Sequence, residues 1–140
     1  MEKISRHQEN FIIMTVIYDE IADQTAGQGH NFRDVDEIIS EMTDDPIPFK
    51  EHSAYVQNMI SSVLNHYGEI INAFSPHLRN WKWERLPLLT QSVLLMSYAH
   101  FYYVEKIDKR IVINTAVELA KKYIEEKQAK FINAILDEVL

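Results

Sequence analysis

The chain has 140 residues, with 14 Lys and Arg against 21 Asp and Glu, a net charge of −7 at pH 7. Its hydrophobic content of 46% excludes a disordered chain, and the absence of cysteine excludes a disulfide framework and thiolate chemistry. The negative charge argues against simple non-specific DNA binding. Residues 1–70 hold 4 cations against 13 acids, whereas residues 71–140 hold 10 against 8. The second half therefore has room for a local anion-binding face.

The first predicted helix runs from about residue 6 to 23. Ser5 and Gln8 have the spacing of an N-terminal capping box, and apolar residues recur on one helix face. Gly27 and Gly29 predict that a loop follows. The whole chain has only 3 glycines and 4 prolines, which favours helices over strands.

A short second helix is predicted over 35–42, with Asp34 as N-cap and Glu37 completing a capping box. A long helix is predicted over about 49–74, with a break near Gly68 as an alternative.

The second half begins at Ser75-Pro76, where we expect serine to be an N-cap and proline to occupy the first helical position. A short helix or turn over 77–85 carries both tryptophans. The remaining helices are expected at about 87–104, at 108–124 with Asp108 as the cap, and at 127–139. Together these elements predict a compact all-α bundle of six or seven helices with no strand.

The beginning of the chain is polar and lacks the apolar region of a signal peptide. The most apolar stretch, 86–104, is interrupted by polar residues, so it is interpreted as a buried central helix and not as a membrane span. The expected location is the cytoplasm.

No catalytic site, metal site or cofactor site is predicted. The six histidines lack the spacings that place two metal ligands on one helix face, and each is interpreted as a surface or cap residue. The three glycines do not form a nucleophile elbow or a phosphate-cradling loop.

Two regions have the composition of a nucleic-acid contact. The first holds Lys3, Arg6, His7 and Gln8, which can reach phosphates, and Tyr18, which can stack on an unpaired base. Spacing alone favours the simpler alternative of a frayed polar terminus and a core tyrosine.

The second region is the C-terminal third. Apolar residues between 113 and 136 predict two core-facing helices with a lysine-rich edge. Small residues are expected to permit close packing there: Ala116, Ala120 and Ala134.

The C-terminal residues resemble the signature of the NusB family of transcription antitermination factors. The two matching segments are Ile113-Asn114-Thr115-Ala116-Val117-Glu118-Leu119-Ala120-Lys121 and Lys130-Phe131-Ile132-Asn133-Ala134-Ile135-Leu136. Trp81 with Glu84-Arg85-Leu86 is similar to a family segment before the central helix, and Tyr18 occupies the place of a family aromatic. The resemblance covers essentially the whole chain, strongly over 76–140 and weakly over 25–60.

The resemblance implies a single NusB-like domain over 1–140, with two packed helical subdomains at about 1–75 and 76–140. It implies a non-enzymatic factor that binds boxA-like single-stranded RNA of nascent ribosomal RNA transcripts. The implied partners are the ribosomal small-subunit protein NusE and the RNA polymerase antitermination complex, without a membrane or direct DNA contact. The RNA-binding residues that it implies are Lys3, Arg6, His7, Gln8, Tyr18, Lys127, Gln128, Lys130 and Phe131.

The chain departs from the family pattern at several positions. Thr115 and Ala134 replace a usual glutamate and glycine, and a helix glutamate is missing from Tyr98-Ala99-His100-Phe101, where Y-E-L or F-E-I is common. The N-terminal arm is also less basic than is usual in the family. One alternative is therefore a NusB-like protein-interaction module that has lost most RNA binding. Another is a domain associated with a ribosomal RNA cytosine methyltransferase, for which this chain has no catalytic cysteine and no cofactor loop.

Overall fold

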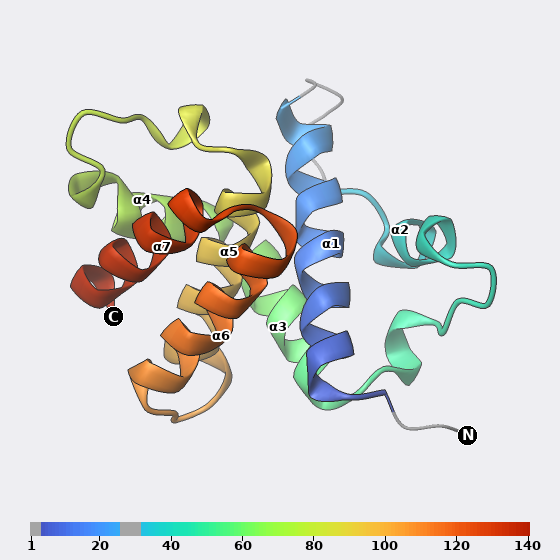
Figure 1. Ribbon diagram of the computed structural model, residues 1–140. Coiled ribbons are helices and arrows are strands. Elements are labelled where there is room, and N and C mark those ends of the chain that lie inside the picture. The colour runs from blue at the N-terminus through green and yellow to red at the C-terminus, as the bar shows by residue number, and fades with distance from the viewer. Residues whose placement is uncertain (1–3, 26–31) are drawn as a thin grey trace.

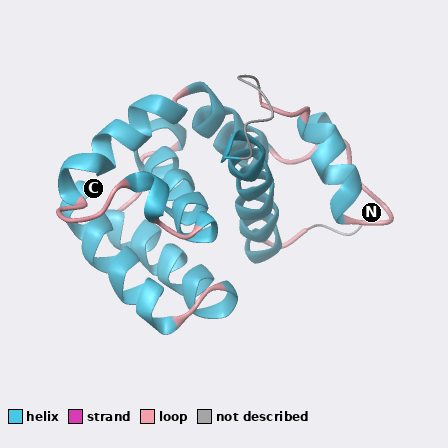
Figure 2. Ribbon diagram, turned by 90° about the horizontal axis from the view of Figure 1, so that it is seen from above, coloured by secondary structure: helices cyan, strands magenta, loops and turns pink. Residues whose placement is uncertain are grey.

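The computed structural model describes residues 4–25 and 32–140. Seven α-helices and short connections make up this part of the chain, which contains no strand (Figures 1 and 2). The predicted all-α class is confirmed. The α-helices are α1 (Arg6–Thr25), α2 (Val35–Met42), α3 (Ala54–Asn65), α4 (Tyr67–Phe74), α5 (Leu88–Ala99), α6 (Lys109–Tyr123) and α7 (Glu126–Val139). Single 3₁₀ turns occupy Phe49–Glu51, Ser75–His77 and Trp83–Arg85, and a π-helical turn occupies His100–Val104.

Helix α5 is the centre of the bundle. Every residue from Thr90 to Ser97 is buried, because α1, α3, α4, α6 and α7 all pack against this helix. Helix α2 contacts α1 and lies on the side of α1 away from α5 (Figure 1). Buried side chains from all seven helices form one continuous hydrophobic core. None of the helices in the described ranges has the length and apolar composition that crossing a membrane requires.

Polar caps set several helix boundaries. Ser5 and Gln8 form the predicted capping box, with each backbone N–H donating to the other's side chain at 2.9 and 3.1 Å. Asp108 accepts from the Arg110 N–H and begins α6, also as predicted. Asp34 caps α2, but Glu37 does not complete a capping box as predicted, because its carboxylate lies 3.8 Å from Arg33 instead.

The predicted single helix over 49–74 is wrong. Ser53 accepts a hydrogen bond from the Val56 N–H, so α3 begins at residue 54. The helix breaks at His66, which has φ −120° and ψ 21°, two residues before Gly68, so the alternative of a break near Gly68 is confirmed. Ser75 is also not an N-cap, since its hydroxyl donates back to the carbonyl of Ile71 at the end of α4.

Two of the histidines are cap residues, as the prediction of surface or cap positions allows: His52 ends the Phe49–Glu51 turn and His100 ends α5. His52 and His100 are buried, and their Nε2 atoms lie 3.0 Å from the Ile47 carbonyl and 2.8 Å from Glu105 respectively. Beyond Ala99 the central helix continues as a π-helical turn to Val104, where the Glu105 N–H donates to the His100 carbonyl. Ala116 and Ala120 are buried as predicted, but Ala134 is exposed on α7 and does not take part in the close packing.

Candidate nucleic-acid interface

Helix α7 has one face buried in the core and one polar face exposed to solvent. Ala129, Ile132, Ile135 and Leu136 are buried, at the spacing of one helix face. Lys127 and Lys130 are exposed, three residues apart, so they are neighbours on the helix surface. Four predicted site residues, Lys127, Gln128, Lys130 and Phe131, therefore come from two adjacent turns of one helix.

Three of these residues line a groove of about 280 Å³, which we call the Trp81 groove. Its lining consists of Trp81, Arg85, Leu86, Pro87, Lys127, Gln128 and Phe131. Trp81 is 62% exposed, the most exposed of the large hydrophobic side chains in the described part of the chain. Trp81 and Arg85 were not among the predicted site residues. Their spacing in the Trp81 to Leu86 segment was visible in the sequence, but only folding places that segment beside α7.

Helix α5 holds both walls of the Trp81 groove. The Thr90 hydroxyl donates to Oε1 of Gln128 at 2.9 Å. The Gln91 amide donates to the carbonyls of Trp83 and Leu86 at 3.2 and 3.0 Å. Thr90 and Gln91 are both buried, so these bonds connect the core directly to the groove.

The turn that carries Trp81 is also tied to α7. Arg79 has a φ of 55°, in the left-handed region that non-glycine residues rarely occupy. Its guanidinium donates to Glu138 near the end of α7 at 3.1 Å. This exposed ion pair links the two chain segments that form the groove.

The cations around the groove are available to a ligand. Lys82, Arg85, Lys127 and Lys130 are exposed, and none of them forms an ion pair within residues 4–25 and 32–140. The groove thus combines unpaired positive charge with the exposed ring of Trp81 and the half-buried ring of Phe131. This combination suits phosphates and stacked bases.

The predicted residues at the start of α1 already have partners within the chain. Arg6 lies 3.2 Å from Glu9, and its guanidinium stacks 3.6 Å above the ring of Tyr55. Gln8 closes the capping box. Burial raises the pKa of Tyr55 to about 12, an effect that the nearby Arg6 opposes. Lys3 lies outside the described residues.

His7 lies beside α6. Its Nε2 is 3.1 Å from Nζ of Lys122, and one turn later Phe11 packs on Tyr123 with ring centroids 4.9 Å apart. Tyr18 is only about 20° around the helix from His7 and is half-buried. The α1 face that bears the predicted residues His7 and Tyr18 therefore contacts the end of α6, just before α7 begins.

The structure does not gather all nine predicted residues into one pocket. About 18 Å of helix separates Arg6 from Tyr18. The Trp81 groove contains three of the predicted residues, and Lys130 lies next to it on α7. A ligand that contacts both clusters must therefore be an extended chain.

The seven-helix fold and the cationic, aromatic groove define an all-helical protein equipped to bind an anionic chain. The chain belongs to the NusB family, whose model matches residues 11–140.

Named relatives agree with this assignment. A transcription antitermination protein NusB from Clostridium botulinum (strain Kyoto / Type A2) is 31% identical over 130 residues, covering 92% of this chain and 91% of the relative. Another, from Listeria welshimeri, is 30% identical over 106 residues, covering 76% of this chain and 79% of the relative.

Solved structures share the fold. T. maritima NusB superposes with a TM-score of 0.77 at 20% identity, covering 99% of this chain and 92% of that one. The antitermination factors NusB and NusE have been solved in complex with dsRNA, and that structure matches with a TM-score of 0.69 at 19% identity. It covers 97% of each chain.

Proposed function

We propose that the protein is a transcription antitermination factor that binds boxA-like single-stranded RNA of nascent ribosomal RNA transcripts. It acts in the cytoplasm with the ribosomal protein NusE and the RNA polymerase antitermination complex, and its role is to bind rather than to catalyse. The observation that carries the proposal is the Trp81 groove, where cations that have no ion pair among the described residues surround the exposed ring of Trp81 and the half-buried ring of Phe131. The relatives named as transcription antitermination proteins support it.

The groove favours unpaired RNA. Lys127, Lys130 and Arg85 neutralise phosphates, and a base stacks on Trp81 or Phe131. Bases in a duplex are already stacked on each other and offer no free face to an aromatic ring. A duplex of the same sequence is therefore expected to bind more weakly than the single strand.

The start of α1 makes a smaller contribution in this proposal. The charge of Arg6 is already partly neutralised by Glu9, so its net attraction for a phosphate is smaller than that of an unpaired cation. His7 and Lys122 are already adjacent on an exposed surface. An RNA chain that leaves the Trp81 groove along α1 would pass Tyr18 before it reaches them.

The test is fluorescence anisotropy with a labelled boxA-like RNA, at two salt concentrations and with or without NusE. Replacing both Lys127 and Lys130 by alanine is expected to reduce the salt slope by about 1.4, since each lost contact to single-stranded RNA contributes about 0.7. Replacing Lys50 and Lys106 by alanine changes the net charge equally, away from the groove, and should leave the slope unchanged.

Equal slopes for the two double variants would overturn the assignment of the Trp81 groove. Binding to NusE with no RNA signal at either salt concentration would favour the alternative of a protein-interaction module. The engagement of Arg6 by Glu9 and Tyr55 is the observation that favours this alternative.

A further inference from the structure

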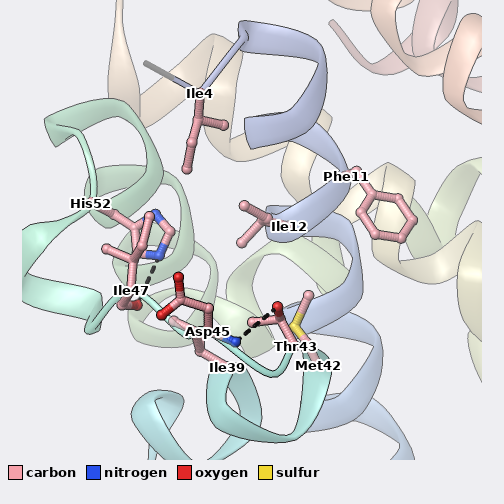
Figure 3. Close-up of a pocket in the computed structure, with 9 residues that line it drawn as sticks. All are labelled: Ile4, Phe11, Ile12, Ile39, Met42, Thr43, Asp45, Ile47 and His52. Atoms are coloured by element: carbon pink, nitrogen blue, oxygen red, sulfur yellow. Dashed lines mark hydrogen bonds between the residues drawn. The ribbon is translucent and has the colours of Figure 1, made fainter. Parts of the chain in front are cut away.

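A second hollow lies between the start of α1 and α2, away from the Trp81 groove. It has a volume of about 250 Å³ and is bounded by the start of α1, the end of α2 and the segment that follows α2 (Figure 3). Ile4, Ile12 and Ile47 point into it, whereas Phe11 extends from the other side of α1 (Figure 3). An apolar cavity of roughly 150 Å³ already accepts a benzene molecule. This hollow therefore has room for a branched aliphatic or aromatic side chain.

A larger hollow of about 760 Å³ adjoins the first one. The two share Ile4, Ile47 and His52, so they form one continuous depression, which we call the Ile47 groove. Its second part extends past Pro46, Pro48 and Glu51 to Tyr55. The combined shape is that of an apolar pocket next to a longer, more polar channel.

Hydrogen bonds hold the wall of the Ile47 groove in place. His52 Nε2 lies 3.0 Å from the Ile47 carbonyl. The Gln57 amide donates to the carbonyls of His52 and Lys50 at 2.8 and 3.1 Å. The Phe49 N–H donates to Asp36 of α2 at 2.7 Å. A ligand that binds here does not have to order this segment, which lowers the entropic cost of binding.

The surroundings of the groove are strongly acidic. Residues 34–53 contain seven acids and only one cation, Lys50, a net of −6 in a chain whose total is −7. Asp44, Asp45 and Glu51 are exposed, and among the described residues none of them forms an ion pair. Arg6 also lines the second part of the groove, but Glu9 lies 3.2 Å from it, so the net charge of this face is negative and attracts cations.

We propose that the Ile47 groove docks a basic segment of a partner polypeptide. One apolar side chain of the segment occupies the hollow around Ile47, and flanking lysines or arginines face Asp44, Asp45 and Glu51. The anchor supplies apolar burial, and the charges supply orientation and speed of association.

This proposal goes beyond the RNA-binding function and does not depend on it. The Ile47 groove and the Trp81 groove have no lining residue in common. A partner in the Ile47 groove and an RNA chain on the Trp81 groove can be bound at the same time.

The probe is a fluorescently labelled peptide of lysines around central leucines, tested by anisotropy without RNA. Two control peptides replace the leucines by serine or the lysines by glutamate. The main variant is Asp45→Lys with Glu51→Lys, which alters only exposed side chains and so preserves the fold. The matched control is Glu84→Lys with Glu125→Lys, an equal change in charge away from the groove. The variant Ile47→Asp tests the apolar hollow.

The peptide with lysines and leucines is expected to bind more tightly than the control peptide with serines. The control peptide with glutamates in place of the lysines is expected not to bind. Reversing Asp45 and Glu51 should weaken binding at least about tenfold, as loss of a main contact does. Ile47→Asp should abolish the advantage of leucine over serine, and the control pair should change nothing.

Equal binding of the leucine and serine peptides, or an equal loss in the control pair, would show only non-specific charge attraction and would overturn the proposal. Sedimentation velocity of the protein alone provides a separate check. Self-association that Ile47→Asp abolishes would assign the groove to a second copy of this chain, and the basic partner would then be wrong. Failure of RNA binding in the earlier experiment leaves all of these peptide results interpretable.

Discussion

The hydroxyl of Thr90 on the central helix donates a hydrogen bond to Oε1 of Gln128 on α7, at a distance of 2.9 Å. Thr90 is fully buried, and Gln128 lines the Trp81 groove. This bond links the packed core to the first turn of α7, where the predicted RNA-binding residues Lys127 and Gln128 lie.

Replacing Thr90 by valine tests this link. Valine keeps the shape but leaves the Gln128 amide without its partner, so we expect a loss of about 1–3 kcal/mol in the free energy of unfolding, measured with urea. RNA affinity should fall as well, because Gln128, which lines the Trp81 groove, is no longer held in place by Thr90. Thr115→Val is the control, since the Thr115 hydroxyl bonds only to its own helix, at the Ile111 carbonyl. Equal stabilities of the two variants would contradict the role of Thr90.

Trp81→Ala is expected to weaken binding of boxA-like RNA roughly five- to hundredfold, the effect of losing one stacked base. Its stability should change little, because Trp81 is mostly exposed. Anisotropy titration together with a urea melt separates the two effects. Tyr102→Ala removes another exposed aromatic ring far from the groove and should leave RNA affinity unchanged.

Stability should depend on pH through Glu20. This carboxyl is 1% exposed, and burial raises its pKa to about 7, although it accepts a 2.8 Å hydrogen bond from the Arg33 N–H. Asp19 and Asp23 on the same helix add negative charge around it. The folded state thus holds a proton that the unfolded chain releases near pH 4.5. The contribution of this proton to the free energy of unfolding is complete below pH 4.5 and is lost as the pH rises to about 7.

Urea melts between pH 5 and pH 8 test this prediction. The wild type should lose up to about 3 kcal/mol relative to Glu20→Gln over this range. Glu41→Gln is the control, because a hydrogen bond from Arg33 lowers the pKa of Glu41 and moves its titration below this range. If the free energy of unfolding has the same pH dependence in the wild type and in Glu20→Gln, the raised pKa of Glu20 is refuted.

Ser53→Ala tests the junction between α1 and α3. The Ser53 hydroxyl donates to Glu9 of α1 and accepts from the Val56 N–H, so it caps α3 and joins two helices. We expect a loss of about 1–2 kcal/mol in unfolding free energy. Ser61→Ala, at an exposed position within α3, should be close to neutral. A loss of the same size at Ser61 would show that the cap contributes nothing specific.

Local rules predicted the start of most helices. The Ser5 and Gln8 box and the Asp34 and Asp108 caps involve residues two or three positions apart, so the chain itself specifies them. The error over 49–74 has the opposite origin. Ser53 is a local cap, but its hydroxyl also reaches Glu9, 44 residues away, and the apolar periodicity across the break resembles one continuous helix.

The sequence by itself determined the all-α class and the membership in a family, because apolar periodicity, caps and signature residues are local patterns. Only the tertiary structure decided which cations remain free. It placed Arg6 over the ring of Tyr55, left Lys127 and Arg85 without an ion pair among the described residues, and brought Trp81 beside α7. The physical reason is that a charge finds its partners through the packing of distant helices around α5. Spacing along the chain carries no information about those distances.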